Sequence, residues 1–320
     1  MKSLCALLFL AGALGANAQT FDIALVTKGN ANEYWKTVHA GAVKAQQDLA
    51  TKGVNVRIEW AAPSSESADA EEAQLVNDFV ARKISGIVLS PTNVQVLCGP
   101  VTAAARSGIP TVVIDSGLND ASQISFVATD NYKGGLVAAR RVGSLLGGKG
   151  RVIVFRFLKY SAGTRARESG FLDAIENQFQ NIQVVDSSHY AGATYEAAQA
   201  SAAALLKAQD SPVDAIFCSN EIASVGMLRA LREAHLAGGK VKLVVFDSST
   251  ATLDGLNAGD VQGIVVQNPF LMGYTGIQTV VAHLQGRQVD PNIDTGCSLV
   301  TLDNISSPEI ADLIHPPVGG

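Results

Sequence analysis

The stretch PTVVID (residues 110–115) is an apolar run that ends in a carboxylate, and a similar run returns as KLVVFD (242–247). The likeness extends past the carboxylate, because VVIDSG (112–117) is repeated as VVFDSS (244–249) about 130 residues later. Short β-branched runs that are apolar on both faces are typical of parallel strands covered on both sides. The repeat therefore predicts two similar halves, each built around such a sheet.

The sequence on either side of these runs alternates between strand-like and helix-like patterns. Strands are expected at residues 21–26, 54–60, 86–90, 110–115, 151–155, 182–186, 214–218 and 242–247. Amphipathic, Ala-rich helices are expected at residues 33–50, 67–82, 94–107, 133–146, 164–178, 194–208, 221–236 and 270–285. A strand followed by a helix, many times over, predicts an α/β fold with two similar Rossmann-like lobes of parallel sheet flanked by helices.

Two further pairs of segments keep the order of the repeat. SGIVLSPTN (85–93) corresponds to VDAIFCSNE (213–221), and HAGAVKA (39–45) corresponds to ESGFLDA (168–174). Each member of the second pair carries a glycine, which we expect to lie where a helix approaches its sheet closely. A chain of 320 residues usually exceeds one core, so two lobes with a cleft between them are expected.

The connection between the lobes is expected to be a hinge of several crossings, because no Pro- or Ser-rich tether separates the halves. Three short extended pieces could each cross between the lobes: SFVATDN (125–131), VVQNPF (265–270) and SLVTL (298–302). The expected N-terminal lobe comprises residues 19–127 plus 268–298, and the C-terminal lobe comprises residues 128–267 plus 299–320.

Residues 1–18 have the pattern of a cleaved secretory signal peptide. Lys2 precedes an apolar run that ends at Leu14, and Ala16 and Ala18 flank the expected cleavage site. The run is too short to span a membrane, which takes about 20 residues. We expect cleavage near Ala18 and a periplasmic location for the mature chain.

Composition and motifs argue against several classes of function. The formal net charge is −5 and no basic run is present, so a nucleic-acid partner is not expected. Cys98, Cys218 and Cys297 have no metal-site or redox spacing, and their spacing leaves one disulfide or three buried thiols open. The histidines are scattered, and no phosphate loop or nucleophile elbow is found. No metal, cofactor or catalytic activity is expected.

Candidate binding residues follow from the strand ends, because ligands of open parallel sheets bind beyond the carboxyl ends of the strands. The first strand is followed by Lys28, Asn32, Tyr34 and Trp35. Aromatic rings can stack on the apolar face of a sugar while polar groups bind its hydroxyls. The alternative is that both aromatic side chains pack in the core.

Polar residues also follow the repeated strands of both halves. Asp115 and Asp247 end otherwise apolar runs, and a carboxylate there either caps the next turn or accepts hydrogen bonds from a ligand. Asn220 and Glu221 end another run, with helix capping as the alternative for Asn220. The same position in both halves favours a shared cleft.

At two other places the sequence pattern does not decide whether a side chain contacts the ligand. Arg165 and Arg167 lie two residues apart in an expected helix and therefore point to different faces, so that either could bind hydroxyls or a carboxylate. Gln267 lies in an expected crossing segment, where an ordinary hydrogen bond to the backbone is the alternative to a ligand contact.

These segments together resemble the type 1 periplasmic binding proteins of sugar ABC transporters, the group that includes the ribose-binding proteins. The resemblance covers nearly the whole mature chain, from FDIALVTKGNANEYW through VLSPTN, VVIDSG, VATDNYKGG, GTRARESGF, FCSNE, GMLRAL and VVFDSS to VVQNPF. It implies two hinged lobes, three crossovers, and a monosaccharide bound between the lobes and delivered to a membrane permease. Such a protein would act as a monomer.

The resemblance also implies particular binding residues. It selects Arg167 over Arg165, and the full set is Lys28, Asn32, Tyr34, Trp35, Asp115, Arg167, Asn220, Glu221, Asp247 and Gln267. Three positions depart from the ribose-binding pattern: Lys28 replaces a small hydroxyl residue, Ser116 replaces an arginine, and Glu221 adds an acid.

The departures leave the ligand open among hexoses, pentoses and amino sugars, because the acids Asp115, Glu221 and Asp247 outnumber Lys28 and Arg167. Other functions also remain open. The chain could serve a chemoreceptor. It could also sense an autoinducer-2-like signal, since Lys28 and Asp115 match the autoinducer-2-binding members of the resembled family. A secreted glycoside hydrolase would use a carboxylate pair in the cleft.

Overall fold

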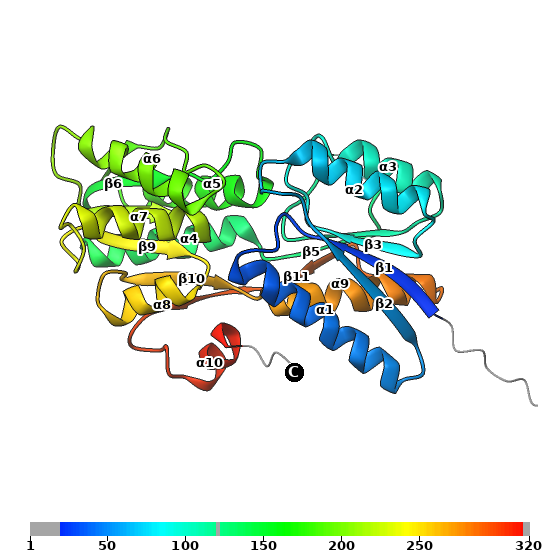
Figure 1. Cartoon of the computed structure of the whole chain (residues 1–320). Coiled ribbons are helices and arrows are strands. Elements are labelled where there is room, and N and C mark those ends of the chain that lie inside the picture. The colour runs from blue at the N-terminus through cyan, green and yellow to red at the C-terminus, as the bar shows by residue number, and fades with distance from the viewer. Residues whose placement is uncertain (1–19, 120–121, 316–320) are drawn as a thin grey trace, which may run out of the picture.

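The chain builds two six-stranded sheets, and the two sheets form separate lobes that lie side by side (Figure 1). The computed structural model describes residues 20–119 and 122–315. The predicted signal peptide lies outside the described residues. The α/β class and the two similar lobes are confirmed.

The first lobe combines the N-terminal elements with two later ones. Its strands are β1 (Thr20–Val26), β2 (Asn55–Ala61), β3 (Gly86–Leu89), β4 (Thr111–Ile114), β5 (Ser125–Ala128) and β11 (Asn292–Asp294). Its helices are α1 (Glu33–Thr51), α2 (Asp69–Ala81), α3 (Cys98–Arg106) and α9 (Pro269–Leu284). Helix α9 packs on α1 and on β3 and β4, which places it in this lobe although it comes late in the chain.

The second lobe holds the remaining elements. Its strands are β6 (Lys149–Phe155), β7 (Asn181–Asp186), β8 (Ala215–Cys218), β9 (Lys242–Phe246), β10 (Gly263–Gln267) and β12 (Cys297–Val300). Its helices are α4 (Asn131–Leu145), α5 (Ala162–Gln178), α6 (Tyr195–Lys207), α7 (Glu221–Glu233), α8 (Thr250–Asn257) and α10 (Pro308–Ile314). The eight predicted strands and eight predicted helices are all present, and the short helices α8 and α10 were not predicted.

The two sheets have the same strand order, which confirms the repeat. The order is β2-β1-β3-β4-β5-β11 in the first lobe and β7-β6-β8-β9-β10-β12 in the second. All pairings are parallel except that of β12, which runs antiparallel to β10. The repeated segments 112–117 and 244–249 therefore occupy equivalent places, at the ends of β4 and β9.

The chain crosses between the lobes three times, after β5, after β10 and between β11 and β12. The predicted boundaries at residues 127 and 298 lie inside β5 and β12. Sheet membership assigns all of β5 to the first lobe and all of β12 to the second. We therefore propose domain boundaries in the connections at residues 129–130, 268 and 295–296.

Glycines on the repeated helices permit close packing of helix against helix, rather than the predicted packing of helix against sheet. A Cβ at Gly41 of α1 would lie 1.9 Å from the carbonyl oxygen of Phe270 on α9, and one at Gly170 of α5 would lie 2.1 Å from that of Tyr132 on α4. The cause is that α1 and α9, like α4 and α5, pack side by side on one face of their sheet and meet along small residues.

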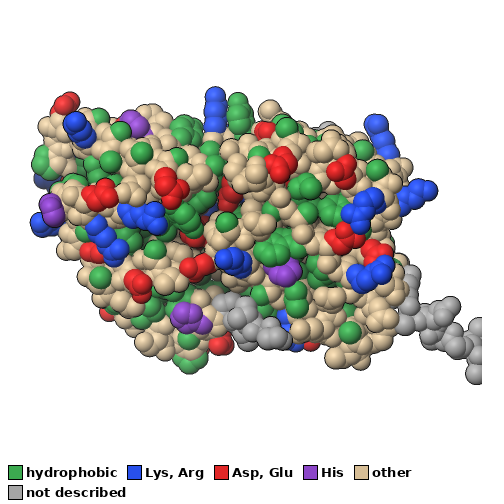
Figure 2. All heavy atoms as spheres, in the orientation of Figure 1, with side chains coloured by type: hydrophobic (Ala, Val, Ile, Leu, Met, Phe, Trp, Pro, Cys, Tyr) green, Lys and Arg blue, Asp and Glu red, His purple; other side chains and the backbone are tan. Residues whose placement is uncertain are grey.

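Apolar side chains on both faces of each sheet form the cores, as the two-sided strands require. Among the described residues, no helix has both the length and the apolar character needed to cross a bilayer. On the face shown in Figure 2, basic and acidic side chains are interspersed over both lobes.

Candidate functional site

A cavity lies between the lobes, and we call it the interlobe cavity. Nine of the ten predicted binding residues line it: Lys28, Asn32, Tyr34, Trp35, Asp115, Arg167, Asn220, Glu221 and Asp247. The tenth, Gln267, lines an adjoining cavity and donates a hydrogen bond to Asp247. Side chains far apart in sequence thus meet where the strand ends of both sheets converge.

The first wall is organised around a buried ion pair. The Nζ of Lys28 donates to Oδ2 of Asp115 at 2.6 Å and to Oγ of Ser116 at 2.6 Å. Both Lys28 and Asp115 are 5% exposed. Burial acts to raise the pKa of Asp115, but the nearby charges of Lys28 and Arg167 outweigh it and lower that pKa. Asp115 is therefore held as a carboxylate.

Tyr34 and Trp35 begin helix α1 and contact both the core and the cavity. The Tyr34 hydroxyl donates to Oδ1 of Asp115 at 2.9 Å, and the indole Nε1 of Trp35 donates to Oε1 of Glu66 at 2.8 Å. Their rings meet edge to face with centroids 4.8 Å apart. Both also belong to the core of the first lobe, so the packing interpretation and the cavity interpretation apply together.

Asn32 is the N-cap of α1. Its Oδ1 accepts from the backbone N–H of Trp35 at 3.1 Å, and its Nδ2 donates to Oε1 of Glu66 at 3.1 Å. Asn is a preferred N-cap residue, because its side-chain oxygen can accept a hydrogen bond from a backbone N–H of the first turn. Asn32 therefore fixes the first turn of α1 and places Glu66 at the edge of the cavity.

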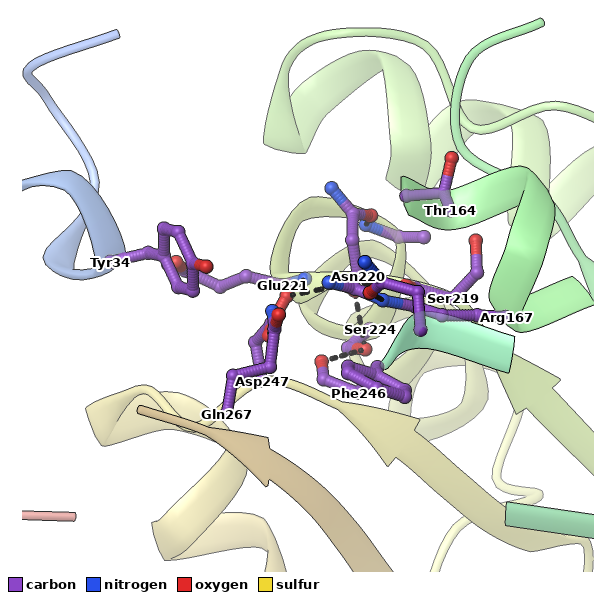
Figure 3. A network of polar contacts seen from close by, with 12 residues as sticks. Tyr34, Thr164, Arg167, Ser219, Asn220, Glu221, Ser224, Phe246, Asp247 and Gln267 are labelled. Atoms are coloured by element: carbon purple, nitrogen blue, oxygen red, sulfur yellow. Dashed lines mark hydrogen bonds and ion pairs between the residues drawn. The ribbon is translucent and has the colours of Figure 1, made fainter. Parts of the chain in front are cut away.

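Arg167 dominates the second wall (Figure 3). Its guanidinium donates to Oδ1 of Asn131 at 2.7 Å and to the carbonyl oxygen of Ser219 at 2.9 Å, and it lies over the Phe246 ring at 3.9 Å. Arg165, by contrast, is exposed. The structure therefore places Arg167, and not Arg165, in the cavity.

Asp247 is paired with Arg167 and enclosed by further donors. Its Oδ2 lies 3.4 Å from Nη1 of Arg167 and accepts from the backbone N–H of Glu221 at 3.2 Å. Its Oδ1 accepts from Nε2 of Gln267 at 2.6 Å. Burial raises the pKa of Asp247 above its usual range, against the lowering effect of Arg167.

Asn220 and Glu221 begin helix α7. Oδ1 of Asn220 accepts from the backbone N–H of Ala223 at 3.0 Å, so the capping interpretation holds for its oxygen while the residue also lines the cavity. Glu221 accepts from the Tyr195 hydroxyl at Oε1, and its Oε2 is buried with no hydrogen-bond partner among the described residues. Burial raises the pKa of Glu221 to about 8.

Several lining residues were not among the predicted ones. Glu66, Ser116, Phe157, Ser161, Gly163 and Thr164 complete the cavity. Glu66 follows β2, so the rule that selected the other strand ends would have found it. Asn131 does not line the cavity, but it orients Arg167, and no local pattern marks that role.

The described residues contain no group of three or more His, Cys, Asp and Glu side chains placed to hold a metal ion. Cys98, Cys218 and Cys297 are free thiols; Cys218 is buried and the other two are partly buried. The arrangement supplies carboxylates, two cations, amides and aromatic edges, which can donate hydrogen bonds to a small polar ligand and accept them from it.

Comparison with known proteins identifies similar chains. A family model described as a periplasmic binding protein domain matches residues 23–288. The ribose import binding protein of Haemophilus influenzae is 27% identical, and the matched region covers 94% of this chain and 100% of that protein's length. The D-allose-binding periplasmic protein of Escherichia coli is 28% identical and covers 89% of this chain and 91% of its own.

Solved structures give the same result. A carbohydrate transporter solute-binding protein from Agrobacterium radiobacter, in complex with D-arabinose, is 35% identical with a TM-score of 0.85, covering 92% of this chain and 99% of its own. An ABC transporter solute-binding protein from Agrobacterium vitis, with bound D-fucose, is 30% identical with a TM-score of 0.86, covering 92% of this chain and 100% of its own.

Proposed function

The chain belongs to the periplasmic binding protein family, and we propose on this premise that it is the sugar receptor of an ABC importer. It binds a monosaccharide in the interlobe cavity and delivers it to the membrane permease. The observation that carries this proposal is that both lobes contribute charged and aromatic side chains to one small cavity. The similar proteins described above bind ribose, D-allose, D-arabinose and D-fucose.

The two-walled cavity supports a clamp-like mechanism. A sugar that contacts Asp115 on one wall and Arg167 on the other gains both sets of bonds only when the lobes are close together. Such a ligand binds the closed form more tightly than the open form. This difference in affinity sets how far the ligand shifts the hinge towards closure. Closure then signals occupancy to the permease.

The ten predicted residues are proposed as the binding set. Asp115, Glu221 and Asp247 would accept from sugar hydroxyls, while Lys28, Arg167 and the free amide hydrogens of Asn220 would donate. Tyr34 and Trp35 would shape the cavity, Asn32 would fix their helix, and Gln267 would hold Asp247. Figure 3 shows Tyr34 facing the cluster formed by Arg167, Asn220, Glu221 and Asp247.

The remaining assignments follow from the family. We infer that the chain is not an enzyme, that residues 1–18 are removed on export to the periplasm, and that the mature chain acts as a monomer. Docking of the closed form to a chemoreceptor is a further role compatible with the same mechanism. The sugar-binding relatives support the transport interpretation over the autoinducer and hydrolase alternatives.

Thermal unfolding of the chain from Gln19 onward, with a panel of pentoses, hexoses, amino sugars, polyols and autoinducer-2, tests the proposal. A sugar at 100 times its Kd should stabilise the fold by about 2.7 kcal/mol. A clear shift with a sugar supports the receptor function. If no sugar in the panel raises the unfolding temperature, the receptor function is contradicted. Release of nitrophenol from nitrophenyl glycosides would contradict the non-enzymatic assignment.

A further inference from the structure

The charges that line the interlobe cavity do not balance. Lys28 is paired with Asp115 at 2.6 Å, and Arg167 is paired with Asp247 at 3.4 Å. These pairs use both cations among the lining residues. Neither Glu66 nor Glu221 forms a salt bridge among the described residues, although the charge of Lys28 acts to lower the pKa of Glu66. Both acids are buried, with exposures of 9% and 3%.

The two unpaired acids differ in how their oxygens are satisfied. Oε1 of Glu66 accepts from Trp35 and from Asn32, which are both neutral donors. Glu221 accepts only from the Tyr195 hydroxyl, and its Oε2 has no partner among the described residues. A buried acceptor without a donor is costly, so the site is incomplete at this atom.

Acidic side chains from both lobes lie near Glu221, and its one hydrogen-bond donor, Tyr195, has the Arg229 guanidinium 5.6 Å from its ring centroid. Tyr195 approaches from α6, and Asp247 lies at the end of β9, where its Oδ2 binds the backbone N–H of Glu221. Glu66 and Glu33 approach from the first lobe, and their negative charges add to the effect of burial in raising the pKa of Glu221. The start of α7 favours a negative charge at Glu221, but only by a fraction of the desolvation cost.

We propose that the sugar carries an ammonium group, which binds Oε2 of Glu221 and lies within the negative field of Glu66. This inference rests on the proposed function and narrows its substrate class to amino sugars. An ammonium supplies three donors and a positive charge, so its binding releases to solvent the proton that burial keeps on Glu221, and the resulting carboxylate accepts from the ammonium at the orphaned oxygen. A hydroxyl at the same place supplies a donor but leaves the acids uncompensated.

Titration calorimetry with matched ligands at pH 7 tests this inference. The pairs are D-glucosamine with D-glucose, D-galactosamine with D-galactose and D-mannosamine with D-mannose, with D-ribose, D-arabinose and D-allose as neutral references. We expect one amino sugar to bind at least tenfold more tightly than its neutral partner and than the three references.

The other outcomes separate this inference from the proposed function. Binding of a neutral sugar as tightly as, or more tightly than, any amino sugar would overturn the inference and leave the receptor function in place. Absence of binding by all nine sugars would overturn this inference, and the receptor function would fall with it only if the wider panel of the unfolding experiment also gave no shift. An amino sugar that binds alone supports both.

A charge-neutral variant tests the assigned contact. Glu221→Gln keeps the shape of the side chain and its acceptor for Tyr195 but cannot form the carboxylate that a bound ammonium would pair with. We expect its preference for the amino sugar over the neutral partner to fall at least tenfold. Glu233→Gln, an exposed change on the same helix, is the matched control and should retain the preference. A Glu221→Gln protein that melts like the control yet keeps the full preference would overturn the assignment.

Discussion

Asp115 and Asp247 share a left-handed backbone conformation, with φ angles of 62° and 70°, at the equivalent ends of β4 and β9. The backbone N–H of each donates to the neighbouring strand, to the carbonyl oxygen of Val127 at 3.1 Å and of Val265 at 2.9 Å. Few residues other than glycine adopt this conformation, although Asp and Asn do so more readily than most. The shared turn directs both carboxylates from their strands into the interlobe cavity.

The backbone strain at Asp247 is open to measurement. Asp247→Val and Asp247→Gly both remove the carboxylate, but glycine accepts a positive φ and β-branched valine does not. We expect the valine variant to be less stable than the glycine variant by about 1–3 kcal/mol in urea unfolding. Equal stability of the two variants would show that the conformation at Asp247 stores no strain.

The ion pair between Lys28 and Asp115 makes a separate prediction. Asp115→Asn tolerates the same backbone conformation but leaves the buried Lys28 without an anion, and we expect a loss of about 3 kcal/mol. Adding Lys28→Met removes the stranded charge, so the double variant should recover most of that loss. Urea unfolding of wild type, both single variants and the double variant forms a complete cycle. A double variant as unstable as Asp115→Asn would contradict this account.

Much of the fold follows from local sequence. The apolar runs that become β4 and β9, and longer helices such as α1 and α4, are regular enough to be recognised without the structure. The helices α8 and α10 have 8 and 7 residues, which is too short for a clear periodic pattern. Their formation depends on packing against the second lobe.

The candidate site is predicted less completely from the sequence than the fold is, for a different reason. Asp115 and Asp247 are conspicuous because a charge at the end of an apolar strand needs an explanation, and both line the cavity. Asn131 has no such signal, because it begins an ordinary helix and acts through its contact with Arg167, 36 residues away. The lack of a partner for Oε2 of Glu221 likewise becomes visible only in three dimensions.

Stability should depend on pH through Glu221. Burial raises the pKa of Glu221 from its usual 4.5 to about 8, so between these values the folded chain holds a proton that the unfolded chain has lost. Stability therefore falls as pH rises from about 4.5 to about 8. Glu221 should account for about 1 kcal/mol of the loss between pH 7 and pH 8. Urea unfolding at both values should show that Glu221→Gln removes this part of the slope.

Glu72 provides the comparison for that experiment. It is fully buried beside Thr92, and burial raises its pKa to about 7. Glu72→Gln should therefore flatten the pH dependence mainly below pH 7 and leave the interval from pH 7 to pH 8 largely unchanged. Flattening of that interval by Glu72→Gln, with none by Glu221→Gln, would reverse the assignment of the two acids.

A contact between the lobes should slow the release of the ligand. The carboxylate of Glu33 on α1 accepts from the backbone N–H of Thr250 at 3.0 Å and from its hydroxyl at 2.9 Å, which joins α1 to α8 across the cleft. These bonds exist only when the lobes are close, so they stabilise the closed form without touching the ligand. If the contact contributes a net value of about 1 kcal/mol, Glu33→Ala should speed ligand dissociation about fivefold in stopped-flow measurements.

Two further variants serve as comparisons. Thr250→Val removes one bond without changing the charge and should have a smaller effect in the same direction, whereas the exposed Lys36→Ala on α1 should have none. Wild-type dissociation from both Glu33→Ala and Thr250→Val would mean that this contact does not hold the lobes together.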